Sequence, residues 1–135
     1  MPHIVKLAVN SVSCAASFSQ IAAVAALDGP QDDVEQMAAE FAQRRRLITD
    51  GLRAIPGINC PEPEGAFYAF PSIKGTGMSS GEFEERAMSE AGVALLSGSA
   101  FGEFGEGYVR LSYANSQDNI QKALENLDRF VRSAT

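Results

Sequence analysis

The pattern of apolar residues along this 135-residue chain predicts an α+β fold: a small mixed or antiparallel sheet with helices packed on one face, preceded by a long helix. Apolar residues recur at three- and four-residue steps between Val34 and Ile55, and again between Ile120 and Phe130, which is typical of helices. Short apolar runs separated by glycine and proline lie between these segments and indicate strands. The content of 45% hydrophobic and 21% charged residues is that of one ordinary globular domain.

The N-terminal segment predicts an apolar helix that needs a partner. Residues 4–27 are rich in Ala, Val and Ser, with a break of small residues at Asn10–Ser17. The run Phe18–Leu27 (FSQIAAVAAL) predicts a helix with almost no polar face. Another surface must cover such a helix in a soluble protein, so we expect the chain to associate. Asp28-Gly29-Pro30 then forms a turn.

A long helix follows this turn. Acidic residues at its start complement the positive end of the helix dipole, and Pro56-Gly57 ends it. The only basic run, Arg44–Arg46, falls largely between the apolar positions and is interpreted as a solvated helix face. The apolar positions are Val34, Met37, Ala38, Phe41, Ile48, Leu52 and Ile55.

Two strands are predicted after the long helix. The first spans Ile58–Cys60, and the second, Ala66–Phe70, follows the proline-spaced turn Pro61–Gly65. Both faces of the second strand are apolar, so we expect it to be covered on two sides or to line a pocket on one. Its aromatic pair, Phe67 and Tyr68, therefore belongs either to a core or to a ligand wall.

Two further helices have recognisable starts. Ser79 and Glu82 have the spacing of a capping box, and Gly92 is expected to end that helix as a C-cap. Ser116 is expected to cap the last helix. The apolar face of the last helix consists of Ile120, Leu124, Leu127 and Phe130.

Two more strands, Val93–Leu96 and Tyr108–Tyr113, flank a glycine-rich loop. The loop, Gly98–Gly107, has enough glycines to cradle an anion, but it carries two glutamates and no Lys-Ser/Thr pair follows it. We interpret it as a flexible turn with a buried Phe101 and not as a phosphate-binding loop.

Composition and charge argue against several function classes. The balance of 11 basic and 17 acidic residues gives a net charge of −6, so no nucleic-acid partner is expected. Cys14 and Cys60 lack the spacing of a metal site or a disulfide framework and fit a reducing cytoplasm. The one histidine, His3, is interpreted as a surface residue near the start. No stretch predicts a membrane span or a signal peptide.

Arg110 is the candidate binding residue. Strand alternation separates it from Val109 and Leu111, which we expect in the core, and directs it toward solvent or a cleft. Its planar fork suits a carboxylate bound by two parallel hydrogen bonds. Taken alone, however, the pattern favours an ordinary surface arginine.

No catalytic, cofactor-binding or metal-binding residue is predicted within the chain. The three lysines are Lys6, Lys74 and Lys122, and none lies in an apolar pocket-forming context that would lower the pKa of its amine enough to hold a Schiff base. The remaining carboxylates follow helix-surface spacing and are assigned to solvation.

Six segments in order give the chain a resemblance to a known family. Together they resemble the C-terminal third of class I/II, fold-type I aminotransferases, close to the bacterial aspartate aminotransferases, over residues 4–133. Ser97, where many relatives carry proline, and Ala16-Ser17, in place of Asn-Pro, depart from the pattern. The segments are Asp28-Gly29-Pro30, Phe41 with Arg44–Arg46, Leu52 with Ile55-Pro56-Gly57, Pro63–Phe70, Gly98–Gly102 and Gly107–Ala114.

The resemblance implies an enzyme with a large cofactor-binding domain and a small domain that closes over the substrate. Residues 1–29 would be a loop and apolar helix packed on the missing large domain, and residues 30–135 would be the small C-terminal domain. Arg110 would grip the substrate α-carboxylate, and Phe67 would lie beside the substrate. The substrates would be an amino acid and a 2-oxo acid, and the subunit would form a homodimer in the cytoplasm.

The resemblance also implies pyridoxal phosphate as the cofactor of the intact enzyme. The family's Schiff-base lysine would lie upstream of Met1, so we expect the fragment to bind no cofactor and to be inactive by itself. Two alternatives stay open. One is a stand-alone, non-catalytic module that binds an amino acid or a partner chain through the Arg110 cleft. The other is a relative of the same fold that performs decarboxylation or C–C cleavage.

Overall fold

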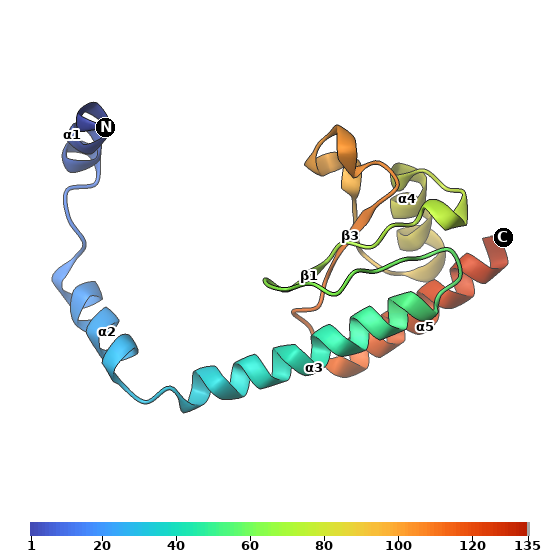
Figure 1. The fold of residues 1–135 in the computed structure, drawn as a ribbon, viewed down its shortest axis with the longest axis horizontal. Coiled ribbons are helices and arrows are strands. Elements are labelled where there is room, and N and C mark those ends of the chain that lie inside the picture. The colour runs from blue at the N-terminus through green and yellow to red at the C-terminus, as the bar shows by residue number, and fades with distance from the viewer. Residues whose placement is uncertain (135) are drawn as a thin grey trace. The chain divides into compact units, whose positions relative to one another are not determined.

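The computed structural model describes residues 1–134 (Figure 1). It confirms the α+β fold with a small antiparallel sheet and helices. The elements are α1 (Pro2–Ser11), α2 (Ser17–Asp28), α3 (Asp32–Ala54), β1 (Tyr68–Ala69), the 3₁₀ helix η1 (Lys74–Thr76), α4 (Ser80–Ala91), β2 (Leu96–Ser97), the 3₁₀ helices η2 (Gly98–Phe101) and η3 (Glu103–Gly105), β3 (Val109–Ser112) and α5 (Gln117–Ala134).

The internal contacts divide the chain into two units, Met1–Gln36 and the residues from Met37 onward. The first unit holds α1 and α2, neither of which buries a residue. The predicted helix at Phe18–Leu27 is confirmed as α2, whereas α1 was not predicted. The β-branched Ile and Val residues of the first ten positions fit a strand as well as a helix, so the sequence pattern did not indicate α1.

The long helix is confirmed as α3, but only its second half is buried. Val34 and Met37 are 53% and 58% exposed, whereas Leu52 is 1% exposed. The buried half of α3 lies beside α5 (Figure 1), and Gly51 of α3 faces the Leu124 side chain of α5. A larger residue at this position would clash with Leu124, so the glycine leaves room for that side chain.

The sheet has three short antiparallel strands in the order β1-β3-β2. The prediction of a strand at Ile58–Cys60 was wrong, because this segment contributes only a single bridge between Asn59 and Ser72. Pro61 follows at once and cannot donate a backbone hydrogen bond to a longer ladder. The other strands are shorter than predicted, and β2 is shifted toward the C-terminus, to Leu96–Ser97.

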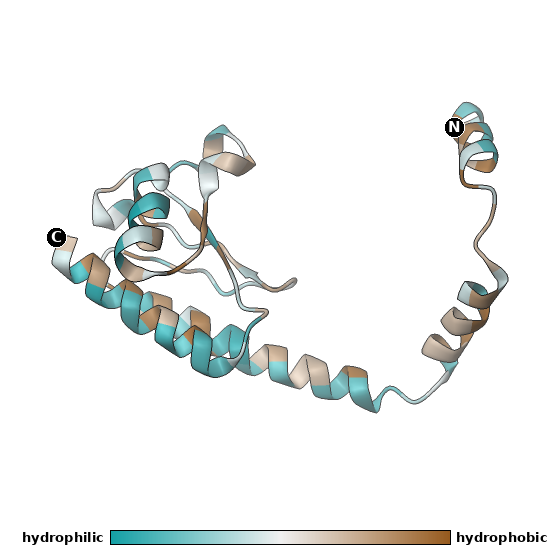
Figure 2. Cartoon of the chain, turned by 180° about the vertical axis from the view of Figure 1, so that it is seen from behind, coloured by the Kyte–Doolittle hydropathy of each residue, from teal (hydrophilic) through white to brown (hydrophobic). Residues whose placement is uncertain are grey.

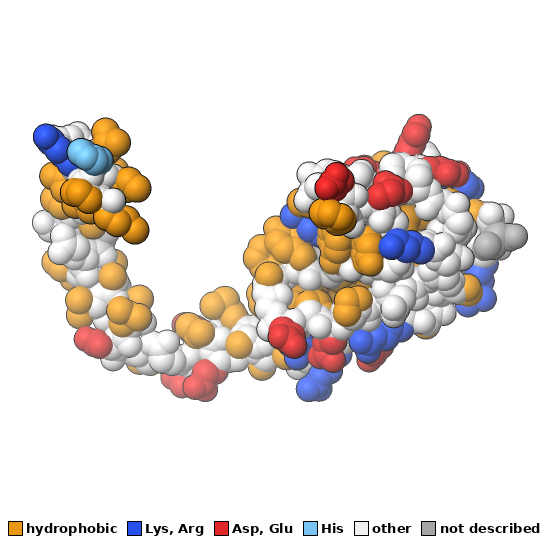
Figure 3. Space-filling view, turned by 45° about the horizontal axis from the view of Figure 1, so that its top comes forward, with side chains coloured by type: hydrophobic (Ala, Val, Ile, Leu, Met, Phe, Trp, Pro, Cys, Tyr) orange, Lys and Arg blue, Asp and Glu red, His pale blue; other side chains and the backbone are white. Residues whose placement is uncertain are grey.

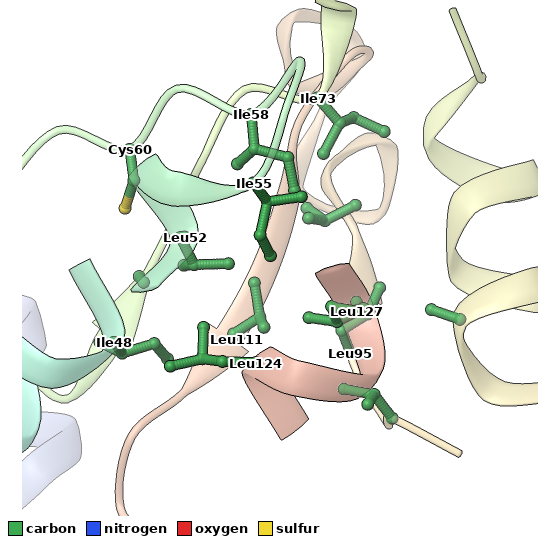
Figure 4. Close-up of a cluster of buried hydrophobic side chains, with 14 of the residues drawn as sticks. Ile48, Leu52, Ile55, Ile58, Cys60, Ile73, Leu95, Leu111, Leu124 and Leu127 are labelled. Atoms are coloured by element: carbon green, nitrogen blue, oxygen red, sulfur yellow. The ribbon is translucent and has the colours of Figure 1, made fainter. Parts of the chain in front are cut away.

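One hydrophobic core joins the helices to one face of the sheet (Figure 4). The predicted apolar face of the last helix is confirmed, since all four of its residues are buried along α5. Phe83 of α4 packs edge-on against Phe130 of α5, with ring centroids 5.5 Å apart. Figure 4 shows Ile48 of α3 reaching Leu124 of α5, with Leu111 of β3 close by.

The predicted helix ends at Ser79, Gly92 and Ser116 are confirmed, although the Glu82 carboxylate pairs with Arg86 and does not complete a capping box with Ser79. The Ser79 hydroxyl accepts a hydrogen bond from the Glu82 backbone N–H (3.2 Å), and Gly92 adopts the left-handed conformation at φ 66°. At α5 the Ser116 hydroxyl accepts from the Asn119 backbone N–H (3.3 Å). These local signals fix where α4 and α5 begin, and so fix which residues of each helix meet the core.

Candidate functional site

The strand β3 presents two different faces, as the sequence predicts. Val109 and Leu111 point into the core, with 1% and 6% of their surface exposed. Arg110 lies on the opposite face and is half-buried. Cross-strand partners share a face, and Tyr68 of β1 pairs with Ser112 while Leu96 of β2 pairs with Arg110. The face that carries Arg110 therefore receives side chains from all three strands.

Two aromatic rings lie against the Arg110 guanidinium. Its Cζ atom is 4.3 Å from the ring centroid of Tyr68 and 4.4 Å from that of Phe101. No carboxylate of residues 1–134 forms an ion pair with Arg110, and no hydrogen bond occupies its N–H groups within this described range. The Arg110 guanidinium thus packs against aromatic rings, and its N–H donors remain available to an added anion.

The prediction of a buried Phe101 was wrong. Phe101 is 50% exposed, because it leaves the core and turns toward Arg110. The loop that carries it is folded into η2 and η3 and is tied to α4: the Ser80 hydroxyl accepts hydrogen bonds from the backbone N–H groups of Gly107 (2.7 Å) and Tyr108 (3.2 Å). A carboxylate oxygen of Glu106 accepts from the Ser80 backbone N–H (2.8 Å).

Phe67 lies at the edge of the same aromatic face and is 41% exposed. Its ring centroid is 4.5 Å from that of Tyr68 and 6.4 Å from that of Phe41 on α3. The preceding residue, Ala66, has a φ of 58°, which residues with a Cβ atom rarely adopt. Its carbonyl accepts a hydrogen bond from the Tyr113 hydroxyl (2.9 Å), which fastens the segment before Phe67 to the core.

Burial raises the pKa of the Tyr113 hydroxyl, and the positive charge of Arg45 partly opposes this rise. Tyr113 therefore stays protonated and keeps its hydrogen bond at neutral pH. Arg45 was interpreted as part of a solvated helix face, and the structure shows a different role. Its guanidinium donates to the Pro63 carbonyl (3.2 Å) and pairs with Glu62 (3.4 Å), so it holds the turn before β1.

Two hollows of the domain lie away from Arg110. One of about 360 Å³ opens beside α5, with Val93, Leu111, Asn119 and Lys122 in its wall. Arg110 lines neither this hollow nor the one between Glu90 and Ser133.

The sequence model of class I and II aminotransferases matches residues 3–127. The chain belongs to this family. It is 42% identical over 128 residues to an aspartate aminotransferase of Pyrococcus horikoshii, covering 93% of this chain and 33% of that protein. It is 44% identical over 132 residues to the aspartate aminotransferase of Geobacillus stearothermophilus, covering 94% of this chain and 33% of that protein.

Solved aminotransferase structures share the fold. An aromatic aminotransferase from Pyrococcus horikoshii superposes with a TM-score of 0.87 at 40% identity, over 96% of this chain and 35% of that one. The aspartate aminotransferase from Rhizobium meliloti gives a TM-score of 0.84 at 35% identity, over 93% and 34%. The chain therefore spans about a third of the length of the aminotransferases that it matches.

The family is generally dependent on pyridoxal phosphate. An amine that holds this cofactor must be shielded and activated, whereas Lys6, Lys74 and Lys122 are all exposed. Lys74 is engaged instead with the ring of Tyr108, 4.9 Å from its amine.

Within residues 1–134, no three histidine, cysteine or acidic side chains gather as a metal site would require. None of the helices in the described part of the chain combines the length and apolarity needed to cross a membrane.

Proposed function

We propose that the chain is the substrate-carboxylate-binding C-terminal domain of a pyridoxal phosphate-dependent aminotransferase, which transfers an amino group between an amino acid and a 2-oxo acid. The observation that carries the proposal is the state of Arg110. Its guanidinium is half-buried against two rings and makes no ion pair with residues 1–134. A cation that is partly desolvated and unpaired in this way is suited to bind an anion from outside the domain.

Arg110 would act by binding and orienting the substrate. Two parallel N–H···O bonds from a planar fork fix both the position and the rotation of a carboxylate, which an ammonium cannot do. The rest of the amino acid is then directed toward the reacting group of the cofactor, which supplies the bond chemistry when it is bound. Closure of a second wall over this face would exclude water and strengthen the charge pair.

Phe67 would lie beside the substrate. Its exposed edge and its contact with the Tyr68 ring, which itself lies against Arg110, support this role. A partly exposed ring next to a charged group offers an apolar surface to the substrate's carbon atoms while the carboxylate stays on the arginine.

Residues 1–29 would pack on the large domain of the subunit and residues 30–135 would form the small domain, within a cytoplasmic homodimer. Figure 3 shows apolar side chains, in orange, along the segment that carries the pale blue histidine, His3. Phe18 and Leu27 on α2 are 77% and 81% exposed, which supports a missing partner surface. The free thiols of Cys14 and Cys60 support a reducing compartment.

The 135-residue chain alone should have no transaminase activity, because it offers no lysine suited to a Schiff base. The carboxylate role can be tested in a hybrid subunit, in which this chain replaces the matching third of the Geobacillus stearothermophilus enzyme. We expect Arg110→Ala to weaken transition-state binding in the hybrid by about 2–5 kcal/mol, which lowers kcat/KM roughly 30- to 4,000-fold. Arg110→Lys should recover little, because the ammonium lacks the fork.

Arg132→Ala is the matched control, since Arg132 is a surface arginine on α5 paired with Asp128 four residues earlier. The hybrid with Arg132→Ala should have the same kcat/KM as the parent hybrid. An active hybrid whose kcat/KM is unaltered by Arg110→Ala would contradict the proposed role.

A further inference from the structure

On the open face of the sheet, Arg110 lies in a row of aromatic side chains and supplies the positive charge of that row. Phe101 meets Phe70 edge to face, with ring centroids 6.1 Å apart, and Phe70 stacks on Tyr108 at 5.7 Å with only 11° between the ring planes. Tyr68, the other ring against Arg110, contacts Phe67. The row joins side chains from β1, β3 and η2, so three separate segments must fold before it exists.

The way a guanidinium interacts explains what such rings do. Its flat faces are weakly hydrated and pack well on aromatic rings, whereas its N–H groups point outward in its plane. Rings that lie against the faces therefore restrict the rotation of the side chain without using its donors. An unrestrained arginine would lose this rotational freedom only on binding a carboxylate, and would bind it more weakly.

Phe101 is well placed for this task because its own position is fixed from behind. The edge-to-face contact with Phe70 supports its ring. The loop that carries it is closed by a hydrogen bond from the Gly98 backbone N–H to the Tyr108 carbonyl (2.8 Å) and is anchored to α4 through Ser80. The ring of Phe104, which lies three residues further along, is 89% exposed and makes no ring contact within residues 1–134.

We propose that Phe101, together with Tyr68, is a positioning residue that holds the Arg110 guanidinium ready for a carboxylate. The inference rests on the proposed carboxylate-binding role of Arg110 and adds to it the residues that set its strength. Phe101 acts through Arg110 and need not touch the substrate.

The test uses nuclear magnetic resonance on the 135-residue chain with labelled arginine, the Arg110 signals being assigned with Arg110→Lys. Protons of a side chain held over aromatic rings are shifted upfield, so we expect the Arg110 δ protons upfield of their random-coil position. Phe101→Leu should remove about half of this shift, because it keeps an apolar side chain of similar size but leaves only the Tyr68 ring beside Arg110. Phe101→Tyr, which keeps the ring, should retain it.

Phe104→Leu is the control from the same loop and should leave the Arg110 signals unmoved. Because Phe101 is half-exposed, the substitutions should leave the core signals in place, and these report folding in each variant. Arg110 δ protons at their random-coil position in the parent, or an upfield shift that Phe101→Leu leaves undiminished, would overturn the proposal.

Titration with succinate, a plain dicarboxylate, then separates this inference from the proposed function. We expect succinate to move the Arg110 Nε–H signal, with an affinity about three- to tenfold weaker in Phe101→Leu than in the parent. Equal affinities would overturn the positioning effect on binding. A parent chain whose Arg110 signal ignores succinate, but whose δ protons are shifted by Phe101, would count against the carboxylate role while supporting the positioning by the rings.

Discussion

The helices α2 and α5 show how differently the two units of this chain meet their need for burial. In Figure 2 the turns of α5 alternate between teal and brown, whereas α2 is mostly brown and pale. α5 buries five residues and α2 buries none. A helix with one apolar stripe finds its partner inside a single domain, whereas a helix that is apolar around its circumference requires partners on several sides. The unit that begins at Met37 thus carries its own core, whereas no residue of α2 is buried within residues 1–134.

The largest expected difference between the units is in the reactivity of their cysteine thiols. Cys14 is exposed in the first unit, and Cys60 is 1% exposed in the core of the second. Burial also raises the pKa of the Cys60 thiol, with Arg53 partly opposing it, so the reactive thiolate is disfavoured. We expect a thiol reagent to label Cys14 about a thousandfold or more faster than Cys60, which reacts only when the core opens. Peptide mapping of the labelled chain over time measures both rates.

Comparable labelling rates at Cys14 and Cys60 under native conditions would break the comparison. Denaturation in urea should make the two rates similar, which provides the reference.

Two phenylalanines test the same contrast in stability. Phe83 on α4 is fully buried, whereas Phe18 on α2 is 77% exposed. Phe83→Ala should lower the free energy of unfolding by about 3–5 kcal/mol, through lost burial and a new cavity. Phe18→Ala should change it by less than about 0.5 kcal/mol, and should weaken self-association of the chain. Urea unfolding measures the first quantity and sedimentation the second.

A large loss of stability from Phe18→Ala in the dissociated chain would show that α2 already has a partner within residues 1–134. The division of the chain into a self-sufficient and a dependent unit would then be wrong.

Local signals in the sequence predicted the parts of the fold that local interactions fix. Ser79, Gly92 and Ser116 mark helix ends through hydrogen bonds that span a few residues, and they were identified correctly. The strands depend on pairing between distant segments, so their lengths and the failure of Ile58–Cys60 could not be predicted from local preference.

The candidate site shows the same limit. Strand alternation predicted that Arg110 leaves the core, and the pairing of Tyr68 with Ser112 follows once β1 and β3 are known to be neighbours. Phe101 comes from a loop without periodicity, so nothing in the sequence predicted its contact with Arg110. The apolar character of Phe101 favoured the core, but the loop's attachment to Ser80 keeps it on the open face.

Tyr113 lies between the core and the candidate site, and its hydroxyl tests how firmly the two are joined. Tyr113→Phe removes the hydrogen bond to the Ala66 carbonyl and should cost about 0.5–1.5 kcal/mol of unfolding free energy. The raised pKa means that the parent is most stable below the ordinary value of 10.0 and loses this contribution as the pH rises through the folded-state value. Urea unfolding at neutral and alkaline pH should show an alkaline loss that is smaller in the variant. Equal alkaline losses would mean that Tyr113 does not titrate with unfolding.

The smallest effect is expected at Glu40, near the point where α3 first contacts α5. Its carboxylate accepts hydrogen bonds from Arg44 (2.8 Å) and from the Gln117 amide of α5 (3.2 Å), and these bonds lower its pKa below the ordinary 4.5. Because the pKa of Glu40 is lower in the folded chain than in the unfolded chain, its ionised carboxylate stabilises the fold at any pH above the unfolded-state pKa. This stabilisation is lost as the pH falls through the folded-state pKa. Glu40→Gln should therefore destabilise the chain slightly at pH 7 and not at all in strong acid. Because the group lies at the surface, added salt should also reduce the difference. Urea unfolding measures the difference in unfolding free energy between parent and variant. If that difference is the same across the acid range, the contact between α3 and α5 at this point does not depend on the charge of Glu40. The self-sufficient unit would then be held together by its apolar contacts further along α3.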